Sequence, residues 1–229
     1  MRSFLLLSLL LLITACGNDT PSATNGISAS EPPVAASLSE PATENTLPAE
    51  QEQIDLIRSE YELIAREFQA EVYAKDSIVY DCYDEPVDGQ FDYYVDQTGA
   101  LRLATNSYTL GDHMGVLEHW YFRDGTPFFM LREEGSWRFG GELEVDEEGN
   151  EYPGTVDNIA EHRFYFADGA LIRHLVKEYE IKSWEEAPDP ASLPNETVAH
   201  NGEMPETWPW VKDMVENRTL DCGKVVLAE

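Results

Sequence analysis

The chain has 229 residues, of which 44 are acidic and 15 are basic, so its formal charge at pH 7 is −29. This charge argues against nucleic acid as a partner, because binding a phosphate backbone requires Lys and Arg. It also argues against a polybasic contact with lipid headgroups. Three explanations of the charge remain: a solvated acidic surface, a cationic partner, or loose association with Ca²⁺ or Mg²⁺. We favour the solvated surface.

Residues 1–15 have the pattern of a signal peptide. Arg2 precedes an apolar run of about ten residues, 4–13, which is too short for a membrane-spanning helix. An ordinary cleavage after Ala15 would place Ile13 where a small residue is needed. The segment LITAC, residues 12–16, instead resembles the lipobox of bacterial lipoproteins. The resemblance implies cleavage before Cys16, a diacylglyceryl group on its thiol, and acylation of the new N-terminus with chains such as palmitate.

A lipidated Cys16 would anchor the protein in the membrane of the cell envelope, since each buried CH₂ contributes about 0.8 kcal/mol. Gly17 stands where Gram-negative lipoproteins retained in the inner membrane tend to have Asp, which favours the outer membrane. The alternative is a secreted protein with an incidental cysteine. Loss of Arg2 with the signal peptide would bring the mature charge to −30.

Residues 16–50 read as a lipidated cysteine followed by a disordered tether. The segment after Cys16 is rich in Ser, Thr, Ala, Pro and Glu and has no Lys, Arg or aromatic residue. Such a composition cannot bury enough apolar surface to offset the entropy of ordering. As a flexible coil, about 34 residues would reach on the order of 30 Å.

Cys82 and Cys222 remain once lipidation has used Cys16. The compartment beyond the inner membrane is oxidising, so we expect a disulfide between them. The alternative is two free thiols or a metal site, but no His lies near either cysteine at a spacing typical of zinc ligands.

Residues 51–229 suit one β-rich domain of α+β class. It opens with a predicted amphipathic helix over 51–72, in which apolar side chains recur every three or four residues. These are Ile54, Ile57, Tyr61, Ile64, Phe68 and Val72. The polar opposite face requires that the apolar stripe packs on the sheet that follows.

Three segments, 93–103, 120–130 and 164–174, each place aromatic residues before an Asp and a Gly and then another apolar run. Asp–Gly suits the tight turn of a hairpin, so we expect an antiparallel meander sheet of repeated hairpins. Asp146 and Gly149 have the spacing of Asp96 and Gly99 and predict a further turn. These units loosely resemble those of MORN-like repeats and of many bacterial lipoproteins, which implies an antiparallel sheet and says almost nothing about activity.

The C-terminal part predicts a long Pro-rich surface loop after residue 184 and then a short helix over 207–218. Thr207 suits its N-cap, and Trp208, Val211, Met214 and Val215 share one face. A short strand is expected after Cys222.

No P-loop, GxSxG or HExxH motif is present, and we expect no cofactor. The Glu–His pairs Glu118–His119 and Glu161–His162 recur in similar stretches, and with His113 they could form a metal site. In an alternating strand Glu118 would share the core-facing side of Trp120 and Phe122, at the strand's entry, and His119 would face away. Aligning the two stretches at their Asp–Gly turns offsets the pairs by one residue, which sends them to opposite faces. We therefore favour an architectural role over metal binding for His113, His119 and His162.

The acidic turns, with Asp84, Asp88, Asp146, Glu147 and Glu148, could hold Ca²⁺ but are better explained as solvated turns. Trp120, Phe122, Phe164 and Phe166 are predicted to be core, while Tyr94, Tyr121 and Tyr165 are left open between core and a ligand-binding face.

These patterns predict a lipid-anchored envelope protein whose module binds a partner, such as another envelope protein, or has a structural role without catalysis. The alternative is an envelope hydrolase or metal-dependent enzyme built from dispersed His and acidic residues. A deep pocket gathering two of His113, His119, His162 and His174 with a carboxylate would favour the enzyme.

Overall fold

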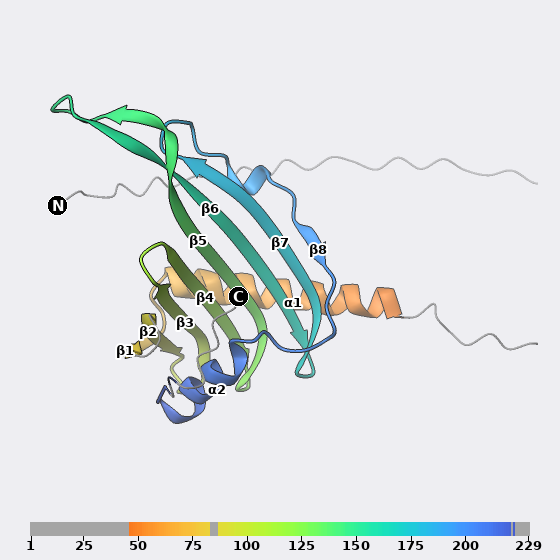
Figure 1. Cartoon of the computed structure of the whole chain (residues 1–229). Helices are drawn as coiled ribbons and strands as arrows, with labels where there is room; N and C mark the ends of the chain where they lie inside the picture. The colour runs from red at the N-terminus through yellow and green to blue at the C-terminus, as the bar shows by residue number, and fades with distance from the viewer. Residues whose placement is uncertain (1–45, 83–86, 221, 223–229) are drawn as a thin grey trace, which may run out of the picture. The chain divides into compact units, whose positions relative to one another are not determined.

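The computed structural model describes residues 46–82, 87–220 and 222. It contains two helices, α1 (Thr46–Gln69) and α2 (Trp208–Asn217), and the short 3₁₀ helix η1 (Pro190–Ser192). Its strands are β1 (Ala74–Cys82), β2 (Val87–Val95), β3 (Leu101–Leu110), β4 (Met114–Arg123), β5 (Thr126–Val145), β6 (Glu151–Ala167), β7 (Ala170–Lys182) and β8 (Glu196–Val198). Figure 1 shows them in chain order across one twisted sheet.

Each strand of the sheet pairs with the next one in the chain, and every pairing is antiparallel. The predicted meander with an N-terminal and a short C-terminal helix is therefore confirmed. A meander needs only local connections, which the closely spaced turn signals supply.

The predicted turns lie where the Asp and Gly residues stand. Asp124–Gly125 joins β4 to β5 and Asp168–Gly169 joins β6 to β7, with positive φ at all four residues. Asp96 and Asp146 form a second kind of corner, in which the side chain accepts hydrogen bonds from backbone N–H groups two and four residues later. Whether these hairpins are copies of one repeat unit stays a prediction.

Helix α1 packs its apolar stripe on one face of the sheet. Ile54, Ile57 and Ile64 are buried against a cluster that includes Leu103, Tyr121, Phe129 and Tyr165. The helix begins at Thr46, so it includes the last five residues assigned to the tether. It ends before Val72, which is exposed, because Glu71 adopts a left-handed conformation and the Val72 N–H returns to the Glu67 carbonyl. The predicted end of the helix was therefore wrong.

Helix α2 packs on the opposite face, over Trp120 and Phe122. Val211 and Met214 are buried as expected, and Trp210, which was not assigned to the apolar face, is buried beside Tyr108. Thr207 stands at the N-cap, but its side chain makes no capping hydrogen bond there. The predicted N-cap position is therefore confirmed, and the capping hydrogen bond is absent because the Thr207 backbone is already helical.

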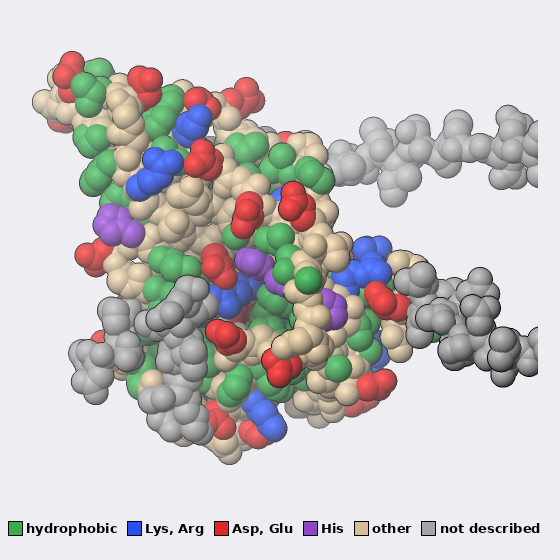
Figure 2. Space-filling model, turned by 45° about the vertical axis from the view of Figure 1, so that its right-hand side comes forward, with side chains coloured by type: hydrophobic (Ala, Val, Ile, Leu, Met, Phe, Trp, Pro, Cys, Tyr) green, Lys and Arg blue, Asp and Glu red, His purple; other side chains and the backbone are tan. Residues whose placement is uncertain are grey.

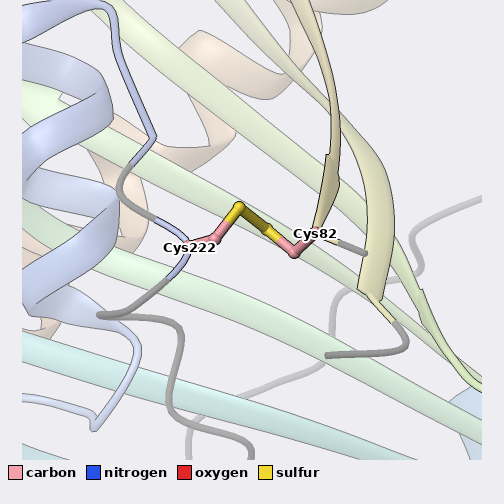
Figure 3. Close-up of a disulfide and its surroundings, with 2 residues drawn as sticks. All are labelled: Cys82 and Cys222. Atoms are coloured by element: carbon pink, nitrogen blue, oxygen red, sulfur yellow. A yellow bond between two sulfur atoms is a disulfide. The ribbon is translucent and has the colours of Figure 1, made fainter. Parts of the chain in front are cut away.

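The predicted disulfide is present between Cys82 at the end of β1 and Cys222 after α2 (Figure 3), with 5.6 Å between the Cα atoms. It connects the segment that carries α2 to the first strand of the sheet.

The segment expected to be a surface loop contains η1 and β8, which pairs with β7 from His174 to Val176. Three residues, of which the first two are exposed, are too short for a recognisable strand pattern. The predicted C-terminal strand, the tether up to residue 45 and Asp84 lie outside the described residues. Among the described helices, none is long and apolar enough to cross a membrane.

Candidate functional site

The three histidines considered for a metal site lie on different elements and do not share one face of the sheet. His113 is exposed in the turn before β4 and lies against Trp137, with ring centroids 4.1 Å apart. His119 is on the α1 face, half-buried and near Phe68. His162 is on the α2 face, in line with Phe164 and Phe166 along β6. Within the described part of the chain, no group of three or more His, Cys, Asp or Glu could hold a metal ion.

The one-residue offset between the two Glu–His stretches is visible in the strand register. Glu118 faces Arg132 across β4 and β5, and Arg132 faces His162 across β5 and β6. Their partners in sequence, His119 and Glu161, belong to the other face. The glutamate of one stretch and the histidine of the other thus share one face of the sheet.

Glu118, Arg132 and His162 thus form a row of side chains across β4, β5 and β6. Glu118 is fully buried (0% exposed) and lies in the middle of β4 rather than at its entry. One carboxylate oxygen accepts hydrogen bonds from Trp120 Nε1 (3.0 Å) and Asn106 Nδ2 (3.4 Å), and the other lies 3.8 Å from Arg132 Nη1. Burial raises the pKa of the Glu118 carboxyl, and the Arg132 guanidinium opposes this shift. The row continues to Tyr80, whose hydroxyl donates to Asn106.

The row extends across β5 to β7 through charged and imidazole groups. Arg132 Nε lies 2.6 Å from Glu134, and Glu134 lies 3.9 Å from His162. The two imidazoles of His162 and His174 are joined by a 3.0 Å contact between Nδ1 and Nε2. One of these nitrogens must donate and the other accept, so the contact requires that the pair is not doubly protonated.

The histidine pair predicts a stability change in mild acid. Burial, with smaller effects from His162 and His200, lowers the pKa of His174 to about 4. A histidine whose pKa is lower in the folded state than in the unfolded state stabilises the fold above the unfolded-state pKa of about 6.5. This contribution is lost as the pH falls toward the pKa of the folded state. We expect wild type to lose about 1–2 kcal/mol more than His174→Gln between pH 7 and pH 4.5, after allowing for solvent screening of a half-buried group. Urea unfolding at several pH values measures this, and parallel curves would contradict it.

A groove of about 680 Å³ lies where α1 meets the turns of both Asp–Gly hairpins. Ile57 and Leu56 of α1 line one side, and Phe128 and Phe166 form apolar walls. Neither His162 nor His174 lines this groove. Tyr121 and Tyr165, which the sequence left open between the core and a ligand-binding face, are core residues buried under α1.

The outer ends of β5 and β6 form a two-stranded ribbon that extends past the rest of the sheet (Figure 1). Pairing of β4 with β5 stops at Ser136, and pairing of β6 with β7 stops at Val156. Trp184 braces the base of the ribbon, since a Cβ added at Gly140 or Gly154 would lie within 2.6 Å of its ring. The two glycines therefore provide the space that the indole fills.

Four large apolar side chains lie on one face of this ribbon and are exposed to solvent. Leu143 is opposite Pro153, and Phe139 is opposite Thr155. Pro153 and Thr155 are two residues apart on β6 and share a face, so Phe139 and Leu143 also share a face although a bulge in β5 separates them. This set, which we call the apolar strip, consists of Trp137 (36% exposed), Phe139 (62%), Leu143 (63%) and Val145 (62%). In Figure 2 green and red side chains are interspersed over this projecting end.

The apolar strip was not recognised from the sequence. Phe139, Leu143 and Val145 alternate with polar residues like any half-buried strand. The signal that could have found them is the pair of glycines at 140 and 141, which interrupts the alternation where the core ends.

Comparison with protein-family models, curated proteins and solved structures gives no match to this chain.

Proposed function

We propose that this protein is a lipid-anchored component of the bacterial cell envelope whose folded domain is a non-enzymatic binding module. The lipobox-like segment ending at Cys16 supports the anchor, with the outer membrane as the favoured location in a Gram-negative cell. The tether would hold the domain away from the headgroups.

The observation that carries the binding role is the apolar strip on the projecting ribbon. A two-stranded ribbon is at best marginally stable in water, and contiguous exposed apolar side chains are a feature of interaction sites. The ribbon extends past the strands that flank it, and its apolar side chains are exposed rather than part of the domain's core. We infer that the ribbon extends in order to meet a partner.

The rival hypothesis, an envelope hydrolase or metal-dependent enzyme, depends on a pocket that gathers histidines with a carboxylate. His162 does lie 3.9 Å from Glu134, and His174 contacts His162. The groove under α1, however, opens onto neither of them. The geometry therefore supports the binding module better than it supports the enzyme.

A Cys16→Ala variant tests the anchor. We expect the wild-type chain to fractionate with the membrane and to be released only by detergent, because several acyl chains give stable binding. The variant should lose the anchor and appear in the soluble envelope fraction or remain as the unprocessed precursor. Metabolic labelling with a palmitate analogue should mark wild type alone. A variant that still carries the label would remove the lipidation proposal.

A further inference from the structure

We propose that the apolar strip docks a protein partner whose contact surface combines apolar side chains with Lys and Arg. This inference rests on the proposed function, since it names the surface and the partner chemistry of that binding module. Its first basis is position: the strip lies on a braced ribbon beyond the ends of β4 and β7.

The second basis is the charge around the strip. Between residues 137 and 157 the ribbon carries seven carboxylates and one basic residue. The acidic residues are Glu142, Glu144, Asp146, Glu147, Glu148, Glu151 and Asp157. The basic residue, Arg138, is already paired with Glu180 at 3.3 Å. A partner that covers the strip therefore meets unbalanced negative charge, which a basic surface neutralises.

The same charge decides against two other occupants. A second copy using the same strip would bring a further seven carboxylates into the contact, because a two-fold interface places identical patches together. An anionic lipid surface would repel the tip in the same way. Acidic residues at the free edges also oppose strand pairing between copies. Charge complementarity thus selects a basic protein surface.

The test uses the full-length chain in its own cells, with the photocrosslinking residue benzoylphenylalanine at chosen positions. Phe139 and Leu143 probe the strip, Leu56 probes the groove under α1, and Val79, 75% exposed on β1, is the matched surface control. We expect one protein adduct at Phe139 and Leu143 and none at Val79.

The captured protein is then purified, and its binding to the full chain in detergent is measured. Leu143→Ser should weaken binding about tenfold or more, because it removes an apolar contact at the centre of the strip. The double variant Glu147→Lys and Glu148→Lys should weaken binding as well, and raised salt should do the same for wild type. Both glutamates are exposed, so their replacement leaves the fold intact.

Adducts at the strip that consist of a second copy or of lipid would overturn the inference, as would binding that the charge-reversal variant leaves unchanged or strengthens. A protein adduct at Leu56 or Val79 but not at the strip would overturn the inference and leave the binding module standing. A protein adduct at none of the four positions would count against both the inference and the proposed function.

Discussion

Replacing both Cys82 and Cys222 with alanine is expected to lower the free energy of unfolding by about 5 kcal/mol, the largest effect that we predict. The disulfide links residues 140 positions apart in sequence, and in the chain-entropy model closing so long a loop restricts the unfolded chain strongly. A loss of this size equals much of the stability of an ordinary domain.

The structure indicates where this loss would appear first. Helix α2 is held by the burial of Trp210, Val211 and Met214 and by the hydrogen bond from the Tyr93 hydroxyl to the Met214 carbonyl. The disulfide fastens the chain just beyond that helix to β1. In the double variant, amide hydrogen exchange should therefore accelerate in α2 before it does in the central strands.

Urea unfolding followed by tryptophan fluorescence measures the total effect. A Cys16→Ala form of the chain that keeps the disulfide is the matched control, and it should unfold like wild type. A loss below 1 kcal/mol in the double variant would contradict the prediction and would indicate an unfolded state that is already compact.

Glu118→Ala is expected to lower the free energy of unfolding by about 3–5 kcal/mol. The substitution leaves buried Arg132 with one acidic neighbour instead of two, and it removes the acceptor for Trp120 Nε1 and Asn106 Nδ2. Buried donors without an acceptor are costly, and the missing side chain also leaves a cavity.

Glu118→Gln separates charge from shape and hydrogen bonding. Glutamine keeps the acceptor for Trp120 but carries no charge, so we expect a smaller loss than for alanine. Because burial raises the pKa of Glu118, its contribution to stability is greatest below the normal carboxyl range and declines as the pH rises through the folded pKa. The free energy of unfolding of Glu118→Gln, measured with urea, should therefore rise relative to that of wild type between pH 5 and pH 8. Equal losses for the glutamine and alanine variants at pH 8 would contradict this reasoning.

Much of the fold was predictable because its signals are local. The stripe from Ile54 to Phe68 predicted α1, and the Asp–Gly pairs at 124–125 and 168–169 predicted two tight hairpins. The disulfide followed from the number of cysteines and from the compartment that the sequence predicts. The short strand β8 was missed because it is defined by its pairing with β7 rather than by any pattern of its own.

The candidate site was much less predictable. The alternation along β4 predicted that Glu118 shares a face with Trp120, but it placed Glu118 at the entry of the strand. In the structure Glu118 is buried and accepts hydrogen bonds from Asn106 on the neighbouring strand β3 and from Trp120 on β4 itself. The pairing of His162 with His174 likewise depends on the register between β6 and β7.

The sequence by itself determined the two helices, the antiparallel meander and the positions of the Asp–Gly turns, because helix and strand periodicity and Asp–Gly chemistry act over a few residues. Only the tertiary structure decided which strands are covered and which are not. Phe139, Leu143 and Val145 have the pattern of core residues, yet they are exposed because β4 and β7 end before reaching them and α1 packs elsewhere on the sheet. Whether a side chain on a strand is buried depends on which other elements pack on that strand in the folded protein.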